Sequence, residues 1–364
     1  MFFSGFFVWE EVVVKKQATF ATTFIPTSRS VFGSKRRSFK SFFYGLRHLV
    51  PLASRHGLLL VRLDAPAPDS RDDTTIHLAV CNLLARTYHK LPPLQCNWKF
   101  DKSGYAILTG VDCSSDVKQQ RPAPQGYSDF FKVLIVGNDK YQQPHILHSY
   151  TSGERRWSVP SKFAFAAMGI SGCMPLRNAR AIVWRGTAHW LVRYFPSHDQ
   201  MQKPGPFHFS KSTSHNSSWH TIDVDAETCR VSLTKIETLS GSDIIHSYDE
   251  AQLTIAADGK LSLFHMRKGG YQLEVWIRQE DGGPSRWLRA SDIELNPPTR
   301  MSLLILGEKG GMLIVKNNHG DVYIVDLETG DMKKVLSFNT INRRQIVPFE
   351  MDWPTFFVSR LGNR

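Results

Sequence analysis

The chain has 364 residues, of which 41% are hydrophobic and 21% charged, a composition that suits a globular protein and argues against wholesale disorder. Lys and Arg number 45 against 33 Asp and Glu, so the formal net charge is +12. This excess favours weak, salt-sensitive attraction to acidic partners, but it fixes neither fold nor specificity. Aromatic residues make up 12% of the chain, which favours strands.

The N-terminal stretch Met1–Trp9 is apolar, but Glu10 and Glu11 end it well short of a membrane-spanning helix or a usual signal sequence. No other apolar stretch approaches spanning length, so we expect a soluble protein without a membrane partner. The five cysteines are odd in number and contain no C-x-x-C pair, which favours neither a zinc knuckle nor a redox motif. This cysteine usage predicts a reducing compartment, the cytoplasm or the nucleus.

Short strands separated by polar turns recur along the chain, whereas long amphipathic helical patterns are nearly absent, which is typical of an all-β fold. The predicted strands, in chain order, are Phe6–Trp9, Val12–Val14, Thr19–Thr22, Gly57–Leu63, Ile76–Cys81, Phe131–Val136, Ala181–Trp184 and Leu253–Ala256. Two turns have recognisable chemistry. Asp258-Gly259 predicts a tight hairpin whose residues adopt positive φ angles, and Asp326–Asp331 predicts a type I turn with Gly330 left-handed.

A weak internal repeat accompanies these strands. Residues Ile222–Val231 resemble Ile324–Met332, and the segments Val80–Pro93 and Ser149–Pro160 share a plan of strand, polar turn, aromatic residue and Pro. Units of about 40–55 residues that end in this way are typical of propeller blades. The chain has room for five such units and a sixth shared between its two ends. We therefore predict one β-propeller of about six blades over residues 1–364, with two β-sandwiches as the alternative.

Two stretches interrupt the pattern, a basic and aromatic loop at residues 28–47 and a polar insertion at residues 196–220. Long loops of this kind are often functional. The first contains the best candidate for a partner-binding patch, because basic residues interleaved with aromatic ones can hold acidic peptides, nucleic acid or a nuclear import receptor. The alternative is a loop whose aromatic residues pack locally. The candidate residues are Lys35, Arg36, Arg37, Phe39, Lys40, Phe42, Phe43 and Tyr44.

Motifs of catalysis or cofactor binding are absent from the sequence: it has no G-x-S-x-G elbow, no P-loop and no G-x-G-x-x-G. His145 and His148 have helical spacing, but the sequence around them is strand-like, while His208, His215 and His220 share the polar insertion. We expect no catalytic, cofactor-binding or metal-binding residues. A propeller enzyme or small-molecule binder that uses the central channel stays open as an alternative. A basic protein associated with nucleic acid is a further one.

An ordered set of segments covers nearly the whole chain: Phe24–Ser28, Pro51–Leu60, Val80–Pro93, Tyr105–Gly110, Ala188–Leu191, Ala257–Leu263 and Val347–Asp352. Together they resemble the C-terminal, Kelch-like propeller domain of plant F-box proteins, particularly the large family found in grasses. The resemblance implies a non-catalytic scaffold, the F-box-associated domain, that recognises a protein target for an SCF-type ubiquitin ligase. In that family an N-terminal F-box binds a Skp-type adaptor. No F-box is detected in residues 1–364, so we expect the adaptor as a partner only if one lies upstream.

Overall fold

The structure, a computed structural model, is built almost entirely of strands. It describes residues 2–14, 17–26, 35–39, 49–63, 75–83, 85–96, 103–113, 130–138, 145–163, 172–173, 180–196, 218–236, 251–256, 258–267, 272–279, 286–296, 303–309, 311–317, 319–337 and 345–351. This part of the chain contains 27 strands and the short helix α1 (Gly110–Cys113). Within the same ranges, no helix has the length and apolarity needed to cross a membrane.

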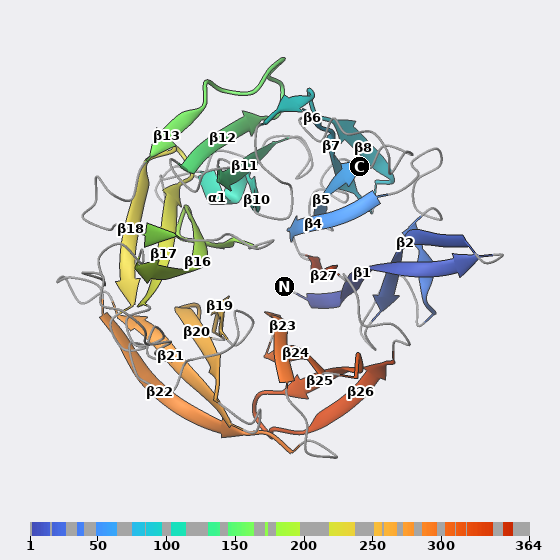
Figure 1. Cartoon of the computed structure of the whole chain (residues 1–364), viewed down its shortest axis with the longest axis vertical. Helices are drawn as coiled ribbons and strands as arrows, with labels where there is room; N and C mark the ends of the chain where they lie inside the picture. The colour runs from blue at the N-terminus through green and yellow to red at the C-terminus, as the bar shows by residue number, and fades with distance from the viewer. Residues whose placement is uncertain are drawn as a thin grey trace, which may run out of the picture.

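Six sheets follow one another around a central axis and form a six-bladed β-propeller, as Figure 1 shows. We name them blades A to F, and each blade is given from its innermost strand outward. Blade A contains β27 (Gln345–Met351), β1 (Phe2–Val14), β2 (Gln17–Pro26) and β3 (Arg37–Ser38). Blade B contains β4 (Leu49–Arg55), β5 (Leu58–Leu63), β7 (Leu78–Asn82) and β8 (Thr87–Lys90). Beside blade B, β6 (Thr75–Ile76) pairs with β9 (Leu94–Gln95).

The remaining four blades follow in chain order, and all strand pairs within the sheets are antiparallel. Blade C contains β10 (Gly104–Thr109), β11 (Phe131–Asn138), β12 (His145–Thr151) and β13 (Ser161–Phe163). Blade D contains β15 (Ile182–Trp184), which together with β14 (Gly172–Cys173) pairs with β16 (Thr187–Pro196), then β17 (Ser218–Asp225) and β18 (Val231–Ile236). Blade E contains β19 (Ala251–Ile255), β20 (Leu261–Met266), β21 (Gln272–Gln279) and β22 (Arg286–Glu294). Blade F contains β23 (Leu303–Lys309), β24 (Met312–Asn317), β25 (Val322–Asp326) and β26 (Met332–Leu336).

Blade A joins the two ends of the chain. Its innermost strand, β27, pairs with β1, with Phe7 opposite Val347, so a C-terminal strand completes a sheet of N-terminal strands. The rings of Phe7 and Phe349 lie 5.5 Å apart edge to face. This arrangement closes the ring and confirms the predicted blade shared between the chain ends.

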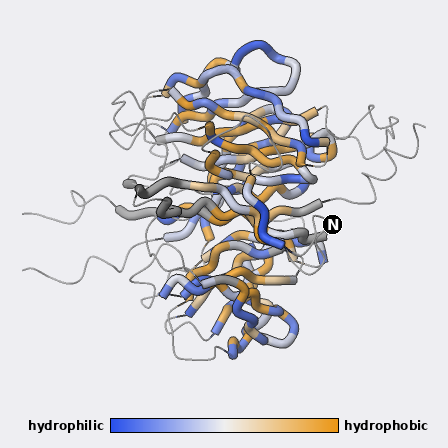
Figure 2. The backbone as a smooth tube through the Cα atoms, turned by 90° about the vertical axis from the view of Figure 1, so that its right-hand side faces the viewer, coloured by the Kyte–Doolittle hydropathy of each residue, from blue (hydrophilic) through white to orange (hydrophobic). Residues whose placement is uncertain are grey.

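The core consists of six hydrophobic clusters, each between two neighbouring blades. Because side chains alternate along a strand, the run of apolar residues in β5 serves two clusters. Leu58 and Leu60 pack against blade C, whereas Leu59 and Val61 pack against blade A. Continuous apolar runs of this kind fit a sheet that is buried on both faces, and Figure 2 shows many strands coloured hydrophobic through the body of the molecule. The sandwich alternative is thus excluded.

The internal repeat corresponds to equivalent hairpins in blades D and F. Asp225 and Asp326 each end the third strand of their blade. The side chain of each accepts hydrogen bonds from the backbone N–H groups two and three residues further along the chain. A left-handed residue closes each turn, Cys229 (φ 57°) in blade D and Gly330 (φ 74°) in blade F. The predicted turn at Asp326–Asp331 is therefore confirmed, with its Asp side chain as the stabilising acceptor.

Other sequence predictions fare differently. The predicted strands of residues 1–27 are confirmed as β1 and β2, while the run Ile76–Cys81 divides into β6 and β7. The prediction for Asp258-Gly259 was partly wrong, because only Gly259 has a positive φ angle, 79°. Bonds from Gly259 N to Ala256 O and from Ala256 N to Lys260 O make this a longer hairpin turn in which one left-handed residue suffices. The structure also places β3 within the predicted loop 28–47, and it begins β17 at Ser218, within the predicted insertion 196–220.

Candidate functional site

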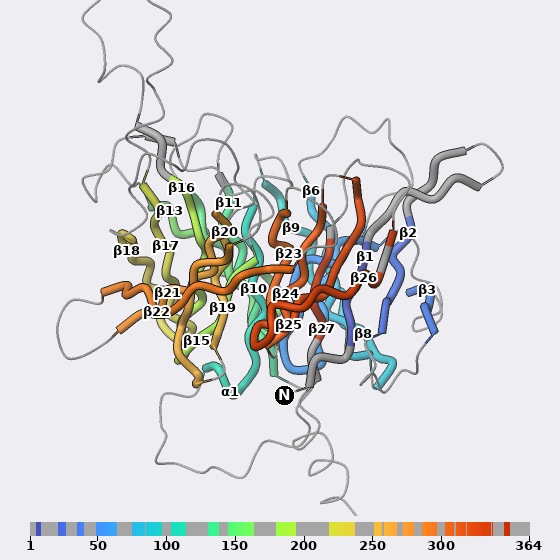
Figure 3. The backbone as a smooth tube through the Cα atoms, turned by 90° about the horizontal axis from the view of Figure 1, so that it is seen from below, coloured from blue at the N-terminus to red at the C-terminus, as the bar shows by residue number. Residues whose placement is uncertain are grey.

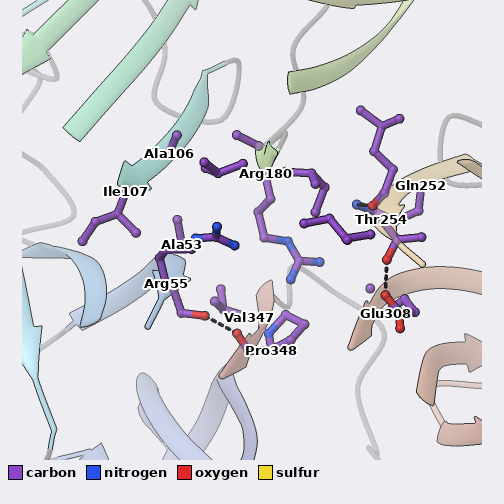
Figure 4. A pocket seen from close by; sticks show the side chains of 17 residues that line it. Ala53, Arg55, Ala106, Ile107, Arg180, Gln252, Thr254, Glu308, Val347 and Pro348 are labelled. Atoms are coloured by element: carbon purple, nitrogen blue, oxygen red, sulfur yellow. Dashed lines mark hydrogen bonds between the residues drawn. The ribbon is translucent and has the colours of Figure 1, made fainter. Parts of the chain in front are cut away.

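A cavity of about 320 Å³ lies at the centre of the ring. All six blades contribute to its wall, through β27, β4, β10, β19, β23 and the residues at and just before β15. The close-up in Figure 4 shows side chains from these separate strands converging on one space. Its size is at the lower end of the range for small-molecule sites in proteins.

Most of the wall is apolar, with Ala53, Ile107 and Val347 among its buried side chains. The ionisable residues of the wall are Arg55, Arg180 and Glu308. The cavity therefore combines hydrophobic surface with a few charged groups, and the partners of those groups decide what it can bind.

Arg180 is held at its backbone by blade C and at its side chain by blade F. Its backbone forms a parallel bridge with Tyr105 of β10, and the next residue donates from Ala181 N to Tyr105 O at 3.2 Å. Its side chain extends from there into the cavity (Figure 4), where Nη2 donates to the carbonyl of Leu306. Burial lowers the pKa of Arg180 to about 10, which leaves the guanidinium protonated at neutral pH.

Space for this guanidinium depends on Gly307. A Cβ atom at Gly307 would lie 3.5 Å from Nη2 and 3.6 Å from Nη1 of Arg180, and 2.9 Å from Cγ of Pro348. Any larger side chain on this face of β23 would occupy the place where the arginine head now lies. The glycine thus lets blades A and F approach the charged group closely.

Glu308, the next residue of β23, already has two donors. Thr254 Oγ1 of β19 donates to Oε2, and Gly311 N donates to Oε1 at 2.9 Å. Both carboxylate oxygens are therefore engaged by blades E and F, and this carboxylate links two innermost strands.

Arg55 forms a mostly buried ion pair with Asp112 of α1. Nη2 of Arg55 lies 2.6 Å from Oδ1 and Nε lies 3.3 Å from Oδ2, while Thr109 donates its N–H to Oδ2 at 2.9 Å. Burial by itself raises the pKa of Asp112, but the hydrogen bond and positive charge of Arg55 outweigh it, and the pKa lies below its usual value. The pair joins β4 of blade B to the helix that follows β10, the innermost strand of blade C.

The histidines singled out in the sequence are dispersed. His145 and His148 are buried in β12, three residues apart, so their side chains leave opposite faces of the strand. Burial lowers the pKa of His148 to about 4, and burial followed by the charge of Lys235 lowers that of His220 to about 4, so both are neutral at physiological pH. His208 and His215 lie outside the described residues. Within the described ranges, no group of three or more His, Cys, Asp or Glu is placed to hold a metal ion.

The structure divides the partner-binding patch predicted from the sequence. Lys35, Arg36 and Arg37 are exposed along the outer edge of blade A. Phe39 is instead buried among Phe7 of blade A and residues of blade B, so it anchors this edge and offers no surface to a partner. The other four patch residues, Lys40, Phe42, Phe43 and Tyr44, lie outside the described residues.

Sequence reasoning missed the exposed basic residues at the outer hairpins of the next two blades. We call them, together with those of blade A, the basic rim: Lys35, Arg36 and Arg37 of blade A, Arg86 and Lys90 of blade B, and Arg155, Arg156 and Lys162 of blade C, all exposed. Its blade C part is fixed against blade B, because Trp157 Nε1 donates to Pro92 O at 2.8 Å. In Figure 3, β3 and β8 lie on the same side of the ring. The pair Arg155-Arg156 beside Trp157 was the available sequence signal.

Comparisons with known proteins give no family. No family model matches the chain, and no curated protein matches it. Among solved structures, a GH93 α-L-arabinofuranosidase of Fusarium graminearum is similar with 11% identity, a TM-score of 0.41, and coverage of 83% of this chain and 81% of that one. The β-propeller domain of the trilobed protease from Pyrococcus furiosus has 9% identity, a TM-score of 0.37, and coverage of 91% and 79%. The N-terminal domain of Nup159 has 8% identity, a TM-score of 0.38, and coverage of 84% and 70%. The likeness is one of fold alone.

Proposed function

We propose that the protein is a non-catalytic scaffold that binds an acidic segment of another protein on the basic rim. The observation that carries this proposal is the uneven distribution of charge. Among the exposed residues that the structure describes, blades A to C have eight basic and one acidic residue, whereas blades D to F have nine basic and six acidic residues. A surface of one sign attracts and orients a partner of the opposite sign.

The basic rim also offers apolar contacts on a rigid support. Tyr88 of β8 is 42% exposed and Val159, which follows Trp157, is 88% exposed. Beneath them, His89 Nε2 hydrogen-bonds the hydroxyl of Tyr150 at 3.2 Å, and the Tyr150 and Trp157 rings lie 5.5 Å apart. Tyr and Arg are among the residues most enriched in binding hot spots, so Tyr88 beside the arginines is the strongest candidate of this surface.

The sequence resemblance supplies the biological setting of the proposal. A propeller similar to the F-box-associated domain would select a target for an SCF-type ubiquitin ligase in the cytoplasm or nucleus. A target held by the rim would be presented to the ligase at high effective concentration, with no chemistry performed by the propeller itself. A Skp-type adaptor would take part only through an F-box upstream of these residues.

Binding of a labelled acidic peptide tests the proposal. The probe is a fluorescein-labelled peptide of alternating Glu and Tyr, followed by fluorescence anisotropy at constant ionic strength. The double variant Arg155→Gln/Arg156→Gln should weaken binding by about tenfold, because two exposed ion pairs of up to about 1 kcal/mol each are lost. Tyr88→Ala should weaken it further.

The matched control is Arg230→Gln/Arg286→Gln, which removes the same charge from exposed positions of blades D and E. It should leave peptide affinity within about twofold. Equal losses in the two double variants would show that net charge, not the rim, attracts the peptide, and would overturn the proposal. A single-stranded oligonucleotide that binds the rim more tightly than the peptide would overturn it in favour of nucleic acid.

A further inference from the structure

The central cavity contains a guanidinium, that of Arg180, with no ion-pair partner among the residues that the structure describes. Among the described residues, Arg180 forms no ion pair, and its side chain has one hydrogen bond, from Nη2 to the carbonyl of Leu306. A guanidinium has five N–H donors, and a charge taken out of water is costly unless it is paired. The part of the chain that the structure describes thus leaves most of the hydrogen-bonding capacity of this group to something else in the cavity.

The other charged groups of the wall do not meet this need. Arg55 is itself a cation and is already paired with Asp112. Both oxygens of Glu308 have donors, from Thr254 and Gly311. Arg180 is therefore the charged group of the wall that is poised to receive an anion, and Gly307 keeps the space around its head open.

We propose that the central cavity binds a small organic carboxylate, with the carboxylate on the Arg180 guanidinium and the apolar part against Ala181, Ile182 and Ile255. A planar guanidinium matches a carboxylate with two parallel hydrogen bonds. These three side chains are apolar and only partly buried, so they favour a hydrocarbon body over a second charged group.

The charge balance of the wall favours a monoanion over phosphate. Arg180 supplies one positive charge that no described residue pairs, and the carboxylate of Glu308 on the same wall repels a dianion more strongly than a monoanion. A volume of about 320 Å³ accommodates a compact aliphatic or aromatic acid and excludes a large polyanion. The cavity is separate from the basic rim, so this inference stands or falls independently of the proposed scaffold function.

Thermal unfolding with added sodium salts at constant ionic strength tests the inference. Benzoate and butyrate should raise the midpoint of unfolding in a saturable way, while benzamide and butyramide, which match them in shape without the charge, should not. Absence of saturation with both carboxylates, or equal effects of the amides, would overturn the proposal. Inorganic phosphate binding more tightly than either carboxylate would overturn the ligand class.

Two substitutions locate the binding. Arg180→Gln should weaken benzoate binding by about tenfold or more, whereas the exposed charge control Arg286→Gln should bind benzoate like the unaltered protein. Circular dichroism establishes that each variant is folded. Should Arg180→Gln fail to fold, Arg180→Lys keeps the charge and loses the two-pronged geometry, and it too should bind benzoate several-fold more weakly. Unchanged benzoate affinity in the folded Gln or Lys variant would refute the assignment.

Discussion

The ion pair between Arg55 and Asp112 shows how one side chain can hold two blades together. The Arg55 and Asp112 side chains are 13% and 5% exposed, and Asp112 also accepts from the N–H and the hydroxyl of Thr109. The hydroxyl of Thr109 is in turn 2.8 Å from Nδ1 of His56, which follows Arg55 in the chain. The carboxylate therefore collects donors from both β4 and β10.

The substitution Asp112→Asn should lower the free energy of unfolding by about 3 kcal/mol, because removing one partner leaves the Arg55 charge largely buried without compensation. Urea unfolding at pH 7 measures this change. The exposed pair of Asp258 and Lys260 provides the control, since its side chains are 46% and 56% exposed. Asp258→Asn should cost less than about 1 kcal/mol, because water and salt already screen such a pair.

The same pair predicts a pH dependence. The pKa of Asp112 is lowered in the folded protein, so its stabilising effect is complete above the ordinary value of 3.8 and is lost as the pH falls below it. The difference in unfolding free energy between the unaltered protein and Asp112→Asn should thus be constant near pH 7 and shrink below about pH 4. A difference that does not change on acidification would mean that the ionised carboxylate is not what stabilises the fold.

At the scale of elements, the turn between β25 and β26 packs against the outer strand of blade E. Gly330 closes this turn, and its carbonyl accepts from Asn296 N at 3.3 Å. A Cβ atom at Gly330 would lie 2.2 Å from the carbonyl oxygen of Glu294. The hairpin of blade F therefore needs glycine for two reasons, its left-handed backbone and its contact with the neighbouring blade.

Gly330→Ala and Gly259→Ala separate these two reasons. Both glycines are left-handed, with φ of 74° and 79°, but a Cβ at Gly259 would meet nothing within 4 Å. Gly259→Ala should cost about 1 kcal/mol for the backbone conformation alone, and Gly330→Ala should cost about 1–3 kcal/mol more because the strand beside it must move. Chemical unfolding of both variants measures the difference, and equal costs would show that the contact with Glu294 contributes nothing.

Hairpins were the elements that local sequence could predict. Asp225 and Asp326 each bond to backbone groups two and three residues further along the chain. Because these interactions are local, the repeat can be recognised in the sequence without knowing the fold. Arg180 was not predictable in this way, because its role depends on Tyr105, Leu306 and Gly307, which only the closed ring brings near it. For the same reason the patch at residues 35–44 was only part of a larger surface. The other exposed basic residues of the rim, such as Arg86 and Arg155, belong to other blades, and the burial of Phe39 depends on blade B.

At the scale of the whole molecule, ring closure joins residues that are far apart in the sequence. Phe7, Phe24, Phe39 and Phe349 form an aromatic cluster in blade A, with Phe7 at 4.9 Å from Phe24 and 5.5 Å from Phe349. Leu59 of blade B belongs to the same hydrophobic cluster. The cluster thus packs β27 against β1 and β2 and packs blade A against blade B. Opening the ring would therefore disrupt contacts both within blade A and between blades A and B.

A double-mutant cycle on Phe7→Ala and Phe349→Ala measures how strongly the chain ends are coupled. Each substitution should cost about 3–5 kcal/mol, and the two should fall short of additivity by about 0.5–1.5 kcal/mol, the range for an aromatic pair in contact. Phe7→Ala combined with Leu263→Ala is the control, because Leu263 lies in the cluster between blades D and E. Those two costs should add within about 0.5 kcal/mol. An additive result for Phe7 and Phe349 would mean that closure depends on the β1–β27 backbone pairing rather than on the aromatic cluster. Coupling with Leu263 as large as that with Phe349 would show that the measured coupling does not come from contact between the two rings.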